Sequence, residues 1–229
     1  WIATWLLFSC FVLPDVLAQK DSLGFRKTSL FPLPLVYYTP ETGWAGGVAL
    51  FAAFRMPGQS DLVRPSQAQL GFAYTQRRQV LFYLPYQIFW AREQNQIYGE
   101  LGYYRYTYLF YGVGNNNPKS NEETYDVDFP RFRLNWLRAI RPHHYLGVRY
   151  WCDNYQINKI APHKLLSTGQ VVGSGGGVLS GAGLLYNFDN RDDVFYPSKG
   201  FWAEIEVFYN QKWMGSDFNF SRVSLDISK

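Results

Sequence analysis

The dominant feature of this sequence is a two-residue alternation of apolar and polar side chains that recurs along most of its length. It is clearest between Gly181 and Asn210, where two alternating segments flank an acidic turn that contains proline and glycine. In the second segment one face is apolar or aromatic throughout, and the other carries the carboxylates of Glu204 and Glu206. Because side chains two positions apart on a β-strand point to the same side, this pattern predicts a hairpin of two amphipathic strands.

The same alternation predicts about ten strands of about 9 to 14 residues each, and no amphipathic helix. In one clear case the apolar face runs from Val80 to Ile88, and the opposite face includes Gln79 and Gln87. Two classes of fold carry such strands. A soluble β-sandwich or lipocalin-like barrel buries its apolar face in a core, whereas a transmembrane barrel turns that face toward lipid.

The composition favours the transmembrane barrel. The polar faces are built largely from Gln, Ser, Gly and Tyr, where a soluble fold would be rich in Lys, Glu and Asp. Aromatic residues reach 19%, with 18 Tyr, 18 Phe and 8 Trp, and membrane barrels place aromatic girdles at both interfaces. We therefore predict an all-β, antiparallel transmembrane β-barrel. The charged residues predicted to face its lumen are Arg131, Arg133, Arg149, Glu204 and Glu206.

Loop lengths predict how the barrel is oriented. Bacterial outer-membrane barrels have long loops outside the cell and short turns in the periplasm. The polar connections at 111–124 and 157–176 are therefore expected outside, and the connection at 56–65 is a medium-length exception on the periplasmic side. The predicted periplasmic turns are 91–95, 140–144 and 189–199.

The first 18 residues form the one continuous apolar run and end at Ala18. This run is typical of a secretory signal peptide with Ala18 as the last residue removed. A single transmembrane anchor is the alternative, but Pro14 and Asp15 interrupt the run before it reaches a bilayer-spanning length. A lipoprotein signal at Cys10 fits less well, because the apolar run continues past the cysteine.

The predicted domain order is a signal peptide at 1–18, a short periplasmic segment at 19–32 and the N-terminal part of an outer-membrane barrel at 33–229. The sequence lacks an initiator methionine and a basic leader, so we expect the true start upstream. Cys10 leaves with the signal peptide, and Cys152 alone cannot form an intramolecular disulfide.

Charge and residue patterns exclude several functions. The net charge of +4 is mild and spread along the chain, which argues against a nucleic-acid partner. His143, His144 and His163 have no Cys or carboxylate cluster at metal-ligand spacing around them. No nucleophile with a nearby base is visible. We therefore predict that the chain is not an enzyme and holds neither a metal nor a cofactor.

The acidic turn carries a more specific signal. The sequence FDNRDD is followed by YPSKG, which gives the spacing D-x-R-D-x-x-x-x-P-x-x-G. This turn resembles that of the BamA/TamA family, the outer-membrane insertase and translocase superfamily also called bacterial surface antigens. The opening PLPLVYYTPETGWAGG and the segment FYGVGNN at 110–116 also look like features of the family. The motif residues are Asp189, Arg191, Asp192, Pro197 and Gly200.

The resemblance implies a barrel of sixteen strands, of which this sequence holds about ten, located in the bacterial outer membrane. It implies a role in the insertion or translocation of proteins, with outer-membrane lipid and client proteins as partners. The family's Val-Arg-Gly-Phe/Tyr loop and last strands are absent here, and about 14 residues after the signal leave no room for periplasmic POTRA domains. A passive pore or a surface-exposed binding protein is therefore the alternative.

The acidic turn also suggests specific contacts. A charge at the rim of a barrel is partly desolvated, and leaving it unpaired costs more than a surface ion pair gains. We therefore expect Asp189 and Asp192 to accept charge-assisted hydrogen bonds from Arg191 or from an arginine of a later loop.

The signal-peptide prediction is tested by the N-terminus of the mature protein. We expect the protein in the membrane fraction to begin at Gln19, because Ala18 provides the small residue before the cleavage site. N-terminal sequencing of that fraction measures this directly. Recovery of residues 1–18 on the mature chain would contradict the prediction.

Overall fold

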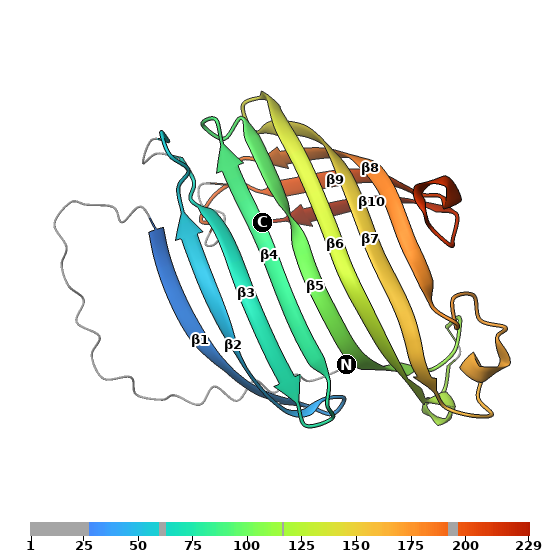
Figure 1. The fold of residues 1–229 in the computed structure, drawn as a ribbon. Helices are drawn as coiled ribbons and strands as arrows, with labels where there is room; N and C mark the ends of the chain where they lie inside the picture. Colours follow the sequence, from blue (N-terminus) through green and yellow to red (C-terminus); the bar gives the residue numbers. More distant parts are fainter. Residues whose placement is uncertain (1–27, 60–62, 116, 192–196) are drawn as a thin grey trace.

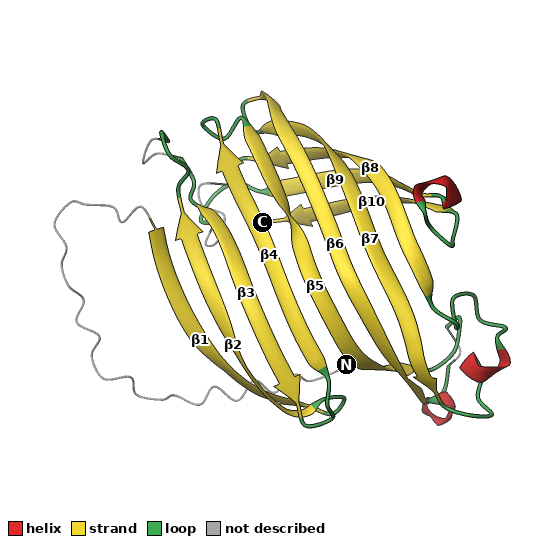
Figure 2. Cartoon of the chain, viewed as in Figure 1, coloured by secondary structure: helices red, strands yellow, loops and turns green. Residues whose placement is uncertain are grey.

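The computed structural model describes residues 28–59, 63–115, 117–191 and 197–229. They form a single antiparallel sheet of ten strands, with three short 3-10 helices in its connections (Figures 1 and 2). The strands are β1 (Thr28–Thr39), β2 (Gly43–Phe54), β3 (Ser66–Thr75), β4 (Val80–Trp90), β5 (Asn95–Phe110), β6 (Glu123–Arg141), β7 (His144–Ile160), β8 (Gly177–Asp189), β9 (Trp202–Asn210) and β10 (Phe220–Ser228). The helices are η1 (Lys119–Asn121), η2 (Leu166–Thr168) and η3 (Lys212–Met214). None of the helices among the described residues has the length and apolar character needed to cross a membrane.

Each strand pairs with the next strand along the chain, so the sheet is a simple meander. It curls strongly, and β8, β9 and β10 pass behind the middle strands of the sheet (Figure 1). Among the described residues β1 and β10 do not pair with each other, so the sheet is open. The predicted all-β class and antiparallel order are thus confirmed, whereas the ten strands do not by themselves form a closed barrel.

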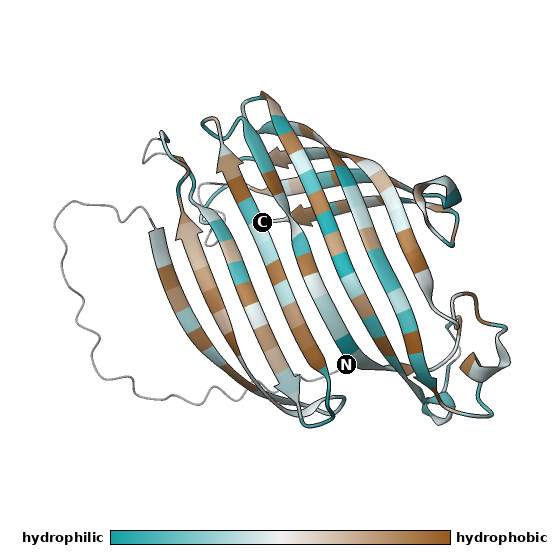
Figure 3. Cartoon of the chain, in the orientation of Figure 1, coloured by the Kyte–Doolittle hydropathy of each residue, from teal (hydrophilic) through white to brown (hydrophobic). Residues whose placement is uncertain are grey.

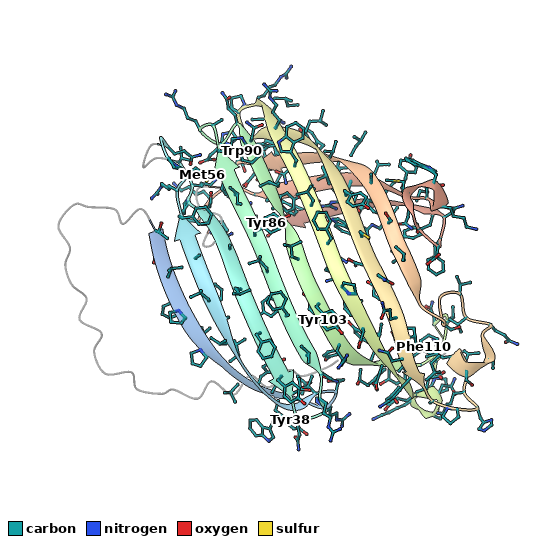
Figure 4. The ribbon with its side chains drawn as sticks, in the orientation of Figure 1. Tyr38, Met56, Tyr86, Trp90, Tyr103 and Phe110 are labelled. Atoms are coloured by element: carbon teal, nitrogen blue, oxygen red, sulfur yellow. The ribbon has the colours of Figure 1, made fainter. Side chains whose placement is uncertain are left out.

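The two faces of the sheet differ as the alternation predicts. The hydropathy of successive residues alternates along most strands (Figure 3). Large apolar side chains are exposed on the convex face, and Trp44, for example, is 61% exposed. Others on this face are Val48, Leu70, Phe72, Phe82, Phe132, Trp136, Leu146, Val148, Leu184 and Ile205. Aromatic side chains also stand at both ends of the sheet, with Trp90 near one end and Tyr38 near the other (Figure 4).

One contact shows how the convex face is packed. The hydroxyl of Tyr86 on β4 donates a hydrogen bond of 3.1 Å to the carbonyl oxygen of Arg133, two strands away. To reach Arg133, the side chain of Tyr86 crosses β5 at Gly99. A Cβ added at Gly99 would lie 1.9 Å from the carbonyl oxygen of Arg133 and 2.9 Å from the tyrosine hydroxyl. Glycine is therefore required at this position, because only a residue without a side chain lets the ring lie across the strand.

Three strands are longer than the sequence pattern predicted. β5, β6 and β7 have 16, 19 and 17 residues, so the expected range of 9 to 14 is wrong for them. The expected loop at 111–124 accordingly shrinks to 111–122, and the one at 157–176 to 161–176. The sequence pattern underestimates the length of β6 because its apolar residues switch from one face of the strand to the other at Pro130. Tyr125, Val127 and Phe129 alternate with polar residues, but they face the opposite side from the apolar residues that follow.

The connections are arranged at the two ends of the sheet as predicted. The short turns after β4 and β6 share one end with the connection after β2 and the acidic turn after β8. The long connections after β5 and β7 lie at the other end (Figure 2). This arrangement places the acidic turn and the long loops at opposite ends of the strands.

Candidate functional site: charged clusters on the concave face

The acidic turn begins at Asp189, the last residue of β8, and its carboxylate lies at the centre of an ion cluster. Arg191 donates to it from the backbone nitrogen, from Nε at 2.9 Å and from Nη2 at 3.1 Å. Arg64, in the connection between β2 and β3, donates from Nη1 at 2.8 Å. The same guanidinium binds Glu93 through Nε at 2.8 Å and lies 3.4 Å from the hydroxyl of Tyr145. Asp189 therefore joins its own turn to two other connections.

Arg64 is held firmly on the concave side. Its guanidinium lies 4.8 Å above the ring of Phe89, and its backbone nitrogen donates to Glu93 Oε1 at 2.6 Å. Burial lowers the pKa of Arg64, but the nearby carboxylates of Glu93 and Asp189 outweigh that effect, so the pKa lies above its ordinary value. The guanidinium is therefore charged at every physiological pH.

The rest of the motif shapes the turn. Gly200 has φ of +91°, and a Cβ there would lie 2.4 Å from the carbonyl oxygen of Asn190, so this position requires glycine. Asn190 closes the hairpin, because its side chain accepts a hydrogen bond of 2.8 Å from the backbone nitrogen of Phe201. Pro197 is exposed. Asp192 lies outside the described residues.

A second cluster, farther along the strands, is centred on Arg149 of β7. It binds Glu204 at 2.8 Å and also contacts Glu206, both on β9. Glu206 is 1% exposed and is bound from the other side by Arg222 of β10 at 2.5 Å. The guanidinium groups of Arg149 and Arg222 also lie 4.5 and 4.9 Å from the ring of Trp151. Two carboxylates and two arginines thus pair around one indole ring.

Neighbouring polar side chains complete this second cluster. The Tyr98 hydroxyl on β5 donates to Glu204 at 2.5 Å, although three strands separate β5 from β9 in the order of the sheet. Asn187 donates to the same carboxylate at 3.3 Å, and Arg149 Nε donates to Asn135 at 2.5 Å. The bond from Tyr98 to Glu204 spans the concavity directly, so the sheet must be tightly curved at this level.

A third cluster lies toward the long loops. Asp153 of β7 binds Arg133 at 2.7 Å and lies 3.3 Å from Arg131. Arg131 also reaches Glu100 of β5 at 3.3 Å, and the Tyr104 hydroxyl donates to that glutamate. The second and third clusters together pair four arginines with four carboxylates among the described residues.

The balance of charge determines what these clusters can do. Buried charges that satisfy one another hold strands in register, because moving one strand would expose an unpaired charge. They offer no surplus charge for an ionic ligand. Among the described residues no group of three or more His, Cys, Asp or Glu could hold a metal ion. His143 and His144 instead contact the carbonyl oxygen of Asp189 and the hydroxyl of Tyr186.

The structure places all five residues predicted to face the lumen on the concave face: Arg131, Arg133, Arg149, Glu204 and Glu206. The expected contact between Asp189 and Arg191 is also present. The second arginine, however, comes from an earlier connection and not from a later loop. Sequence reasoning missed Arg64 because it lies 125 positions from Asp189 in a segment without alternation.

Comparisons with known proteins add no further assignment. No protein-family model matches the chain, and a search of curated proteins finds no match.

The second cluster makes a prediction about stability. Arg149→Met should lower the free energy of unfolding by about 3–5 kcal/mol, because it leaves Glu204 and Glu206 buried with fewer partners. Denaturant titration of the folded protein measures this. Lys159→Met is the control, since Lys159 is exposed and lies 3.6 Å from Asp126, and it should change stability far less. Equal effects would show that the buried cluster does not hold the fold.

Proposed function

We propose that this chain is part of an outer-membrane β-barrel of the protein insertion and translocation superfamily. In this proposal it assists the assembly or transport of proteins at the bacterial outer membrane and carries out no chemistry of its own. The barrel has sixteen strands, ten of which lie in this sequence, and the protein is exported by its signal peptide. Its partners are outer-membrane lipid and client proteins, and nucleic acid is not among them.

The observation that carries the membrane part of the proposal is the polarity of the two faces. Large apolar side chains cover the convex face, whereas charged groups on the concave face are paired. A soluble sheet of this size would bury its apolar face against another layer, and the described residues contain no such layer. Lipid is the solvent that suits an exposed apolar face backed by a polar one.

The acidic turn supports the family role. Its resemblance to the BamA/TamA family rests on Asp189, Arg191, Asp192, Pro197 and Gly200. Asp189 joins three connections at one end of the strands, and Gly200 occupies a backbone conformation that other residues rarely adopt. A solvated hairpin turn needs neither an ion cluster that joins three connections nor a glycine in this conformation.

The lipid face is tested by a pair of charge substitutions on β4. Leu84→Arg in the full-length protein should reduce barrel stability by about 2–4 kcal/mol, because a charge near the bilayer midplane loses its water. Gln87→Arg on the concave face should cost far less, since Gln87 faces away from the apolar convex side and its side chain accepts a hydrogen bond from Gln67. Unfolding from lipid vesicles in denaturant gives both values. If the two variants lose the same stability, the convex face does not meet lipid.

The functional role of the turn is tested by Asp189→Asn. This change removes the charge that binds Arg64 and Arg191 but keeps the shape of the side chain. In cells that depend on the variant, we expect less folded outer-membrane protein, while the variant barrel still resists heat in detergent.

The matched control is Asp126→Asn, which removes a charge on the convex side and should leave outer-membrane assembly unchanged. If Asp189→Asn leaves assembly and stability intact, the turn is a solvated hairpin and the family role fails. A protein that conducts ions in planar bilayers but supports no assembly would instead be a passive pore.

A further inference from the structure

The polarity of the convex face changes partway along β5, β6 and β7. The continuous apolar series on these strands ends at Tyr103, Pro130 and Cys152. Beyond them the outward side chains are polar, apart from Leu109 near the end of β5, and several are bound to one another. Arg105 binds Asp128 at 2.9 Å, Thr107 donates to Asp126 at 2.7 Å, and Lys159 lies 3.6 Å from Asp126. These strands therefore carry a water-compatible outer surface toward the long loops.

The concave face changes polarity at the same level, in the opposite direction. Up to Arg131 it carries the charged clusters, and beyond that residue it is aromatic. The rings of Tyr104, Phe129 and Tyr155 stack at 4.9 and 5.0 Å, and Tyr108 stacks on Tyr125 at 5.8 Å. The amphipathic pattern of the three strands is thus inverted beyond this level.

This inversion marks the edge of the bilayer if the proposed function is right. Below it the sheet is apolar outside and charged inside, as lipid requires, and above it the sheet is polar outside and apolar inside, as water requires. We call residues 104–110, 123–129 and 154–160 the outer extension. The six residues from Glu123 to Asp128 extend β6 about 20 Å beyond the level of the inversion, at the usual rise per residue of a strand.

The outer extension lines one side of a partly open apolar cavity of about 740 Å³. Its walls are the aromatic concave face of the extension, the connection between β7 and β8, and the connection between β9 and β10. Leu166 of η2 is buried against the extension, where its backbone nitrogen lies 3.3 Å from a carboxylate oxygen of Glu123. The glycine-rich segment before β8 packs on Phe218, so closely that a Cβ at Gly177 would lie 2.8 Å from the ring.

This cavity has the properties of a small-molecule site. It is a concave, partly open space whose walls are aromatic and aliphatic side chains. Ligand sites typically measure about 300–1,000 Å³ and combine apolar walls with a few polar groups. The charged group at the floor, Arg131, already faces Glu100 and Asp153, so the ligand needs no negative charge.

We propose that the cavity of the outer extension binds a small, neutral, largely apolar molecule that contains an aromatic ring and enters from outside the cell. The stacked tyrosine and phenylalanine rings hold the ligand by offset or edge-to-face contacts. The tyrosine hydroxyls and Asn219 bind its polar end. The external position rests on the proposed function, whereas the binding itself rests only on the cavity.

The binding is tested with 1-naphthol as the probe. The full-length protein is placed in lipid nanodiscs, and equilibrium dialysis measures bound naphthol against empty nanodiscs. We expect one saturable site per chain. Ile157→Trp should weaken binding by about tenfold or more, because the indole occupies the space of the ligand. Leu179→Phe fills the same cavity with a smaller increase in side-chain volume. It replaces Ile157→Trp in the binding measurement if that variant does not fold.

Thr107→Ala, on the polar outer surface of the same extension, is the matched control and should bind naphthol as the wild type does. Heat-dependent gel mobility shows which variants are folded. Binding that does not exceed that of empty nanodiscs, or folded cavity variants that bind like the wild type, would overturn the ligand site.

A separate measurement tests the external position. In a Cys152→Ser background, an impermeant maleimide applied to intact cells should label Thr107→Cys and spare Leu101→Cys. Equal labelling of the two would overturn the bilayer edge and with it the membrane part of the proposed function. Loss of naphthol binding with the expected labelling would overturn the ligand site alone.

Discussion

The pairing of Arg149 with Glu204 and Glu206 is the interaction on which the concave face depends. Each of these groups is almost wholly removed from water, and none could remain charged there alone. Arg222 and Tyr98 extend the pairing to β10 and β5, so one network ties together strands at both sides of the curl. The curvature of the sheet and the burial of its charges therefore require each other.

The sequence was sufficient to predict the strands and their faces, because a strand's period of two is a local property. The alternation around Val80 to Ile88 and around Glu204 appears in the structure on the expected sides. Whether the sheet closes into a barrel could not be predicted from the alternation. It depends on pairing between the first and last strands of a barrel, and no local pattern encodes that contact.

Two further features escaped prediction for identifiable reasons. The true length of β6 was hidden because its apolar residues change sides at Pro130, and a search for one continuous apolar face stops there. Arg64 was missed because the connection that carries it has no periodicity and its partners lie on distant strands. In both cases the determining contact is between segments that only the folded sheet brings together.

The contact between Arg64 and Asp189 has a consequence for the order of folding. Every strand pairing in the described sheet joins consecutive strands, so the entropy lost in closing each hairpin is small. Arg64 and Asp189 are 125 positions apart, and six strands lie between them in the chain. Their ion pair becomes favourable only after those strands have assembled and curled. The ion pair therefore forms late in folding and stabilises a sheet whose strands have already paired with their neighbours.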